Sequence, residues 1–212
     1  HIPSISVTGR KNVNRDAIDG NFQRNVDNSF ETKTLTFYRE WSTSIDPADV
    51  LDTNMILTIQ NATKVFNEEQ KFPEKDAYTI SKIYADWTAE GKQADKTALT
   101  VDNVLIVFDK LMEAMDEALV PSNGRLLYVT PAVKTLLKQA SQIGLSRNVQ
   151  TGANTINRVV DRLDEIKLIS VPSFLMKTAY SFTTGFEPSG SAKQINLFLV
   201  HPSAILTPIK YS

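Results

Sequence analysis

Two stretches within residues 1–46 alternate between apolar and polar positions, the period-two pattern of a half-buried β-strand. Ile5 and Val7 follow this pattern near the start of the chain. A later stretch, "ETKTLTFYREWSTSID", places four apolar residues on one face, with Arg39 interrupting it: Leu35, Phe37, Trp41 and Ile45. The polar segment between the two predicted strands indicates a protruding β-hairpin arm. Because an isolated hairpin is marginally stable in water, we expect this arm to pack on a partner.

From residue 46 onward the apolar spacing becomes helical. Asp46 followed by Pro47 predicts a helix start, since aspartate caps helices and proline fits the first helical position. One long helix is predicted through "DVLDTNMILTIQNATKVFNEEQ", and a second helix is predicted to start at Pro73 and to end at Gly91. Apolar stripes at three- and four-residue spacing support both helices: Leu51, Met55, Ile59, Ala62 and Phe66, then Ala77, Ile80, Ile83 and Trp87.

Residues 97–144 read as two helices separated by a turn and a strand. Thr100 is predicted to cap a helix over "VDNVLIVFDKLMEAMDEAL". In "VPSNGRLLYVTP", turn formers precede a short apolar strand, and Gly124 can adopt the positive φ that other residues resist. Thr130 and Pro131 then predict an N-cap and first helical position, with the helix ending at Gly144. This alternation predicts a layered scaffold of helices and strands.

The last part of the chain is predicted to contain strands and two polar loops. "INRVVDRLDEIKLISVP" indicates two strands that turn at Asp164 and Glu165, and a short helix over its first half is the alternative. The loops are "GLSRNVQTGANT" and "SFTTGFEPSGSAKQ", and "INLFLVHPSAILTPIKY" supplies the final strands. The overall prediction is an α+β fold.

Composition excludes several functional classes. The 212 residues include 23 Lys and Arg against 24 Asp and Glu, a formal charge of −1, which provides no global attraction for nucleic acid or an anionic membrane. The absence of cysteine excludes disulfides, thiolate nucleophiles and cysteine-ligated metals. No apolar run approaches the roughly 20 residues that span a bilayer, so we expect a soluble protein.

Candidate chemistry is sparse. His1 and His201 are the only histidines, and His201 is interpreted as a hydrogen-bonded residue at a strand end. The carboxylates Asp161, Asp164 and Glu165 are interpreted as a solvated turn, although a metal site or an acid–base pair is the alternative. No glycine pattern resembles a phosphate-binding loop. The sequence therefore predicts no catalytic, cofactor-binding or metal-binding residue, and no enzymatic activity.

The order of several motifs resembles the major capsid proteins of tailed bacteriophages, which share the Hong Kong 97 fold. The motifs that follow the hairpin arm are, in order, "SIDPADVLDTN", "FPEKDAYTISKIYADW", "VPSNGRLLYVTPAVKTLLKQA", "IKLISVPSFLM" and "NLFLVHPSAI". The resemblance covers nearly the whole chain. It implies that residues 1–46 form the E-loop hairpin, residues 46–96 the spine helix and part of the P-domain, and residues 97–212 the mixed α/β A-domain.

The resemblance also implies a function. A major capsid protein self-assembles as hexamers and pentamers into the icosahedral head shell, which encloses double-stranded DNA without sequence-specific binding or membrane contact. Its further partners are scaffolding, portal and prohead protease proteins, and its location is the virion, after assembly in the bacterial host cytoplasm. The implied subunit contacts lie in the arm and in two loops: Arg10, Lys11, Arg15, Arg24, Arg147 and Glu187.

Two expectations remain beside this one. The family's N-terminal arm and final P-domain strand have no counterpart here, so we expect residues to be missing at both ends. The alternative function is a non-enzymatic α+β module that binds a protein or a ligand and docks through its N-terminal arm.

Overall fold

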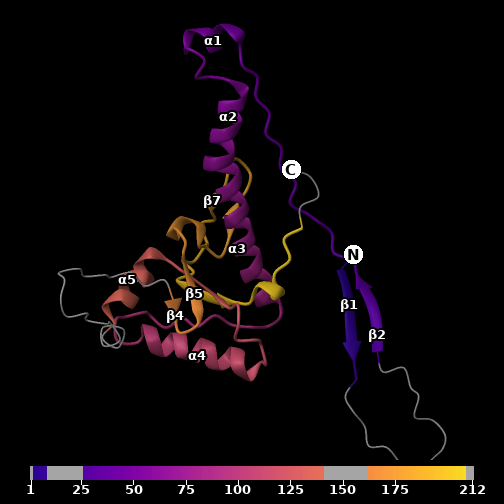
Figure 1. The fold of residues 1–212 in the computed structure, drawn as a ribbon, viewed down its shortest axis with the longest axis vertical. Coiled ribbons are helices and arrows are strands. Elements are labelled where there is room, and N and C mark those ends of the chain that lie inside the picture. The colour runs from indigo at the N-terminus through magenta and orange to yellow at the C-terminus, as the bar shows by residue number, and fades with distance from the viewer. Residues whose placement is uncertain (1, 9–25, 141–161, 209–212) are drawn as a thin grey trace, which may run out of the picture. The chain divides into compact units, whose positions relative to one another are not determined.

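The structure is a computed structural model that describes residues 2–8, 26–140 and 162–208, shown as a ribbon in Figure 1. The chain divides into two units, residues 1–49 and residues 50–212, and each is described by itself. Helices and strands are mixed along the described residues. This mixture is compatible with the predicted α+β class.

The first unit contains the predicted hairpin. Strand β1 (Ile2–Val7) pairs antiparallel with β2 (Val26–Glu31), with Ile2 opposite Glu31 and Val7 opposite Val26. The predicted second strand over residues 31–46 was wrong, because residues 32–46 form neither helix nor strand. The six residues of β1 are all paired with residues 26–31. An alternating pattern needs a partner backbone to become a strand, and residues 26–31 take the place beside β1 that the prediction gave to residues 31–46.

Helix α1 (Pro47–Asp52) begins where predicted, with the backbone N–H of Ala48 donating to the Asp46 side chain at 2.9 Å. The prediction of one long helix from this point was wrong. Asn54 and Met55 have φ values of 54° and 67°, which end the helix. The next helix has its own cap, because the Thr58 hydroxyl accepts from the N–H of Asn61 at 3.2 Å. These local side-chain bonds compete with a continuous helix.

The second predicted helix is longer than expected at its start. Helix α2 (Ile59–Phe66) runs through a π-helical turn, η1 (Asn67–Lys71), directly into α3 (Phe72–Ala89). The predicted restart at Pro73 is therefore wrong, since the helix is already formed there. Proline lacks a backbone donor, and the π-helical turn just before it shifts the hydrogen-bond pattern, with the N–H of Phe72 donating to Asn67. Gly91 follows the helix end with a φ of 76°.

A four-stranded sheet forms the centre of the second unit. Its strands lie in the order β4 (Arg162–Leu163), β5 (Ile166–Ser170), β3 (Leu126–Val129) and β8 (Leu197–Val200). β3 is parallel to β5 and antiparallel to β8, and β4 turns antiparallel onto β5. The predicted turn at Asp164 and Glu165 is confirmed, while residues 156–161 of that prediction lie outside the described residues.

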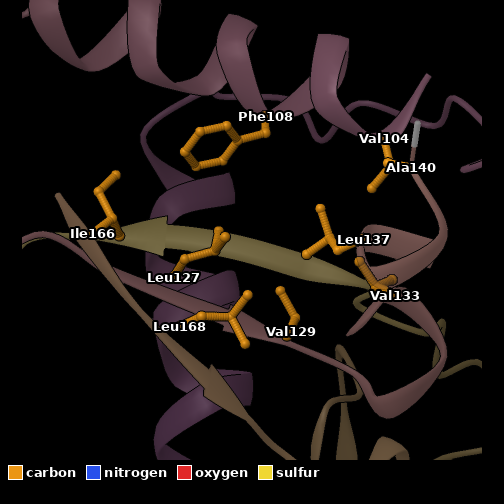
Figure 2. Close-up of a cluster of buried hydrophobic side chains, with 9 residues drawn as sticks. All are labelled: Val104, Phe108, Leu127, Val129, Val133, Leu137, Ala140, Ile166 and Leu168. Atoms are coloured by element: carbon orange, nitrogen blue, oxygen red, sulfur yellow. The ribbon is translucent and has the colours of Figure 1, made fainter. Parts of the chain in front are cut away.

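Two helices cover one face of this sheet. Figure 2 shows Val104 and Phe108 of α4 (Val104–Glu117), and Val133 and Leu137 of α5 (Pro131–Gln139), packed on the strands. The strand residues that meet them alternate along β3 and β5: Leu127, Val129, Ile166 and Leu168. On β3 and β8 the rings of Tyr128 and Phe198, which are opposite each other in the register, stack with centroids 4.8 Å apart.

The ends of α4 and α5 differ in part from the predicted ends. The Thr130 cap is confirmed, because its hydroxyl accepts from the N–H of Val133. Helix α5 nevertheless ends at Gln139 rather than near Gly144, since Ala140 turns to extended backbone and is buried in the core. Helix α4 begins at Val104, later than predicted. The backbone N–H of Thr100 donates to the Asn103 side chain, so Thr100 does not cap the helix through its own hydroxyl.

The segment between β5 and β8 forms a small cluster around buried Met176. It contains the 3₁₀ turn η2 (Ser173–Leu175) and the short antiparallel strands β6 (Tyr180–Ser181) and β7 (Glu187–Pro188). The predicted loop over residues 181–194 is therefore partly strand. After β8 the chain makes a 3₁₀ turn, η3 (Pro202–Ala204), and residues 205–208 contain no strand, contrary to prediction.

Candidate assembly surface

Buried and exposed apolar side chains occupy different parts of the sequence. Within the described ranges, the buried hydrophobic residues all fall between Ala77 and Met176. Most of the exposed large hydrophobic residues fall before them, in two sets. The arm set comprises Ile5, Val7, Val26, Phe30, Leu35, Tyr38 and Trp41, and the spine set comprises Leu51, Met55, Ile56, Leu57, Ile59, Val65 and Phe72.

The arm set lies on the hairpin and on the extended segment that follows it. No residue of the first unit whose burial is described is buried, and Ile5 is 74% exposed. Phe37 and Trp41, which the sequence placed on one apolar face, differ in burial: Phe37 is half-buried, whereas Trp41 is 43% exposed. Over the residues whose burial is described, the arm therefore exposes apolar side chains and buries none of them.

The spine set lies on α1, on α2, on the turn between them and at the first residue of α3. Leu51 and Ile59, which the sequence placed in a packed stripe, are both largely exposed, while Ala62 and Phe66 are half-buried. A helix on the surface of a monomer normally presents polar residues to solvent. This part of the chain instead presents several apolar side chains to solvent.

Apolar side chains in such numbers can support association. Full burial of one Val, Leu, Ile or Phe side chain contributes about 1.5–3 kcal/mol. Association costs an estimated 4–15 kcal/mol in lost freedom of motion. Burial of all seven members of one set would contribute up to about 10–20 kcal/mol, which is comparable with that cost. Exposed apolar patches typically mark interaction sites.

Most of the charged contact residues expected from the sequence lie outside the described residues. Arg10, Lys11, Arg15, Arg24 and Arg147 lie outside the described residues. Glu187 lies on β7 and is exposed. Glu187 is therefore the one residue of these six that the structure describes, and the apolar sets are the surface that sequence reasoning missed. The sequence did contain a signal for an apolar surface, because the apolar residues Ile56 and Phe72 fall outside the predicted buried stripes.

A buried arginine fixes the turn before β3. The Arg125 side chain is 1% exposed and donates to the Asp116 carboxylate at 2.7 Å. It also donates to the backbone carbonyls of Val120 and Pro121. Gly124, beside it, has a φ of 87°, which confirms the predicted need for glycine at this position.

His201, which directly follows β8, hydrogen-bonds to the same turn. Its Nε2 lies 3.2 Å from the carbonyl oxygen of Asn123, so Nε2 carries the donor proton. Its Nδ1 then accepts from the hydroxyl of Ser203 at 2.6 Å and from the Ser203 N–H at 3.3 Å. This is the hydrogen-bonded strand-end histidine that the sequence predicted.

The shifted acid–base groups each have a local cause. Hydrogen bonds from the Thr97 hydroxyl and N–H lower the pKa of Asp95, burial raises the pKa of Asp76, and burial raises the pKa of Tyr180. Asp164 and Glu165 are exposed in their turn, as predicted, and Asp161 lies outside the described residues. Among the residues that the structure describes, no three histidines or carboxylates gather around a possible metal position.

Comparisons of the chain with protein-family models, with curated protein sequences and with solved structures found no match. Within residues 2–8, 26–140 and 162–208, no helix has both the length and the apolar character required to cross a bilayer.

Proposed function

We propose that this protein is a major capsid protein that self-assembles into the icosahedral head shell of a tailed bacteriophage. One observation carries the proposal: the arm and the first part of the spine present two sets of exposed apolar residues, while the core lies between Ala77 and Met176. An apolar surface of this extent on a β-hairpin, an extended segment and a helix fits a subunit that is completed by its neighbours. The motif order set out above, which ends in "NLFLVHPSAI", supports the specific family.

Each region then has a role in assembly. The hairpin β1–β2 and the extended segment after it act as the E-loop, which lies on a neighbouring subunit. Helices α2 and α3 with the π-helical turn act as the spine of the P-domain. The sheet with α4 and α5 acts as the A-domain, which meets its copies around the axes of hexamers and pentamers. Such ring contacts join two different surfaces of one subunit and close by rotation.

The remaining partners follow from this role. The shell encloses double-stranded DNA without reading its sequence, in keeping with the near-zero formal charge of −1. Scaffolding, portal and prohead protease proteins act during assembly in the host cytoplasm, and the mature protein resides in the virion. The proposed role is structural, and no catalytic residue is assigned.

Electron microscopy and sedimentation of the purified full-length protein test the proposal. We expect shells, or rings and pentons, at micromolar concentration. A variant with Ile59→Ser and Phe72→Ser should assemble less, because both substitutions remove spine-set residues, whereas Leu206→Ser, at an exposed leucine outside both sets, should assemble as the wild type does.

Two results would count against the capsid role. A protein that stays monomeric under all assembly conditions would contradict it directly. A protein that binds a different protein or a ligand through its arm, and forms no closed particle, would support the alternative of a docking module.

A further inference from the structure

Leu119 combines two features that are each unfavourable in an isolated chain. Its side chain is 90% exposed, and its backbone φ is 56°, in the left-handed region. A Cβ atom makes that region unfavourable, and an exposed leucine gains nothing from burial to offset it. A chain that acts alone has no use for leucine at this position.

The local geometry identifies the residue that normally occupies the position. The N–H of Val120 donates to the carbonyl of Met115 at 3.0 Å, and the N–H of Leu119 donates to Asp116 at 2.9 Å. This pair of bonds is the Schellman motif that ends many helices, and glycine is the usual residue in the left-handed position. Leu119 stands where glycine would terminate α4 without strain.

The backbone around Leu119 is held firmly. Arg125 donates to the carbonyls of Val120 and Pro121 and pairs with Asp116, so one buried side chain ties both sides of the turn together. The Leu119 side chain is therefore presented to solvent from a fixed backbone. Such preorganisation reduces the ordering cost when a partner covers the side chain.

Charge indicates what the partner is. The last turns of α4 around Leu119 carry the exposed carboxylates of Glu113, Asp116 and Glu117, of which Asp116 is paired with Arg125. Helix α5 carries Lys134 and Lys138 and contains no acidic residue. These two lysines are four residues apart and share one side of the helix.

The acidic end of α4 and the basic helix α5 lie apart on the molecule. Figure 2 shows Val104, the first residue of α4, beside Ala140, which follows α5. Leu119 follows the opposite end of α4, and that 14-residue helix is about 21 Å long. One copy therefore cannot satisfy its own two surfaces, but a second copy can.

We propose that Leu119 anchors a head-to-tail contact between copies of this chain, in which the acidic end of α4 in one copy meets α5 of the next. The aliphatic stems of Lys134 and Lys138 offer apolar area to Leu119, while their ammonium groups attract the Glu113 and Glu117 carboxylates. A contact between two different surfaces closes into a ring if its rotation permits. The inference rests on the self-association in the proposed function and deepens it, because it names the two surfaces that meet.

Leu119→Gly separates this role from a structural one. Glycine removes both the strain and the side chain, so the melting temperature of the dissociated subunit should rise by about 2–4 °C. Self-association should weaken at least tenfold, measured by sedimentation of the full chain across a concentration series. Leu206→Gly, at an exposed leucine elsewhere in the second unit, is the matched control and should leave association unchanged. If Leu119→Gly associates as the wild type does, or if the wild type shows no association, the contact does not exist.

A charge exchange tests which surfaces meet. Glu117→Lys and Lys138→Glu should each weaken association several-fold, and the two combined should restore it, because opposite charges again face each other across the interface. Failure of the double variant to recover would overturn the assignment of α5 as the receiving surface.

Electron microscopy of the same samples distinguishes this inference from the proposed function. Closed shells that form equally well from Leu119→Gly would reject the contact and leave the capsid role standing. Association that depends on Leu119 but produces no shell would support the contact and count against the capsid role.

Discussion

Two regions of the second unit, residues 50–72 and residues 77–176, bury their apolar side chains to very different extents. Between Ala77 and Met176, aliphatic side chains from α4, α5, β3 and β5 fill a shared core, where Phe108 is 2% exposed. Between residues 50 and 72, residues of the same chemical types, such as Ile56 and Ile59, face outward. The difference lies in the partners that the fold provides. A helix over a sheet has a surface to cover, whereas α1 and α2 leave their apolar side chains at the surface.

We therefore expect the buried residues to determine the stability of the subunit and the exposed apolar sets to determine its association. The core residues stabilise the subunit itself, so their substitution should lower its free energy of unfolding. The exposed apolar sets contribute little to that free energy, and their substitution should act on contacts with other molecules. The following substitutions test this division, from the largest expected effect on subunit stability to the smallest.

Phe108→Ala should destabilise the subunit by about 3–5 kcal/mol, because it removes a buried ring from the centre of the core and leaves a cavity. Chemical denaturation of the dissociated subunit measures the change. Ile106→Ala on the same helix is the matched control, since Ile106 is exposed, and it should cost far less. Equal losses for the two variants would show that the core is not where the structure places it.

Arg125→Ala should cost about 2–3 kcal/mol, because the substitution removes a buried side chain and takes a charged donor from the backbone carbonyls of Val120 and Pro121. The Asp116 carboxylate is exposed and returns to water, so no buried charge is left uncompensated. Lys110→Ala, at an exposed cation of α4, should change stability by less than about 0.5 kcal/mol. A similarly small loss for Arg125→Ala would contradict the bracing role assigned to its side chain.

Short-range sequence features, namely caps, prolines and turn formers, correctly predicted several helix starts and turns. The cap at Thr130, the first-position proline at 131 and the turn at Asp164 all follow from side-chain geometry within a few residues. The start of α1 at Pro47 belongs to the same group. Each depends on hydrogen bonds or φ preferences that the sequence states directly.

Non-local partners decided the parts that sequence could not predict. The alternation of Leu35, Phe37 and Trp41 is typical of a strand, but a strand also needs a neighbouring backbone, and the hairpin partner of β1 is residues 26–31 instead. The break at Asn54 and Met55 contains neither glycine nor proline, so no breaker signal marked it. Exposure of the apolar sets is likewise a property of what packs nearby, which periodicity does not contain.

Gly124→Ala should destabilise the subunit by about 1–2 kcal/mol, since a Cβ is unfavourable at a φ of 87°. Space is not the cause, because the added Cβ would lie 3.8 Å from the His201 Nε2, an ordinary contact distance. Gly190→Ala is the control: nothing lies within 4 Å of its Cβ position, and its φ is outside the left-handed region. Thermal unfolding compares the two, and an equal effect would remove the conformational explanation.

The combined variant Ile5→Ser and Phe30→Ser should leave subunit stability nearly unchanged, within about 0.5 kcal/mol, because exposed side chains away from special features contribute little to folding. Both residues lie on the hairpin and are mostly exposed. Assembly should nevertheless fall sharply, since the apolar area that a neighbour would cover is lost from every copy in the particle. Thermal unfolding of dissociated subunits, beside sedimentation of assembled material, measures the two effects separately. Normal particle yield from this variant would remove the arm from the interface and leave the spine set as the remaining candidate, whereas a large loss of subunit stability would mean that the arm packs on its own chain after all.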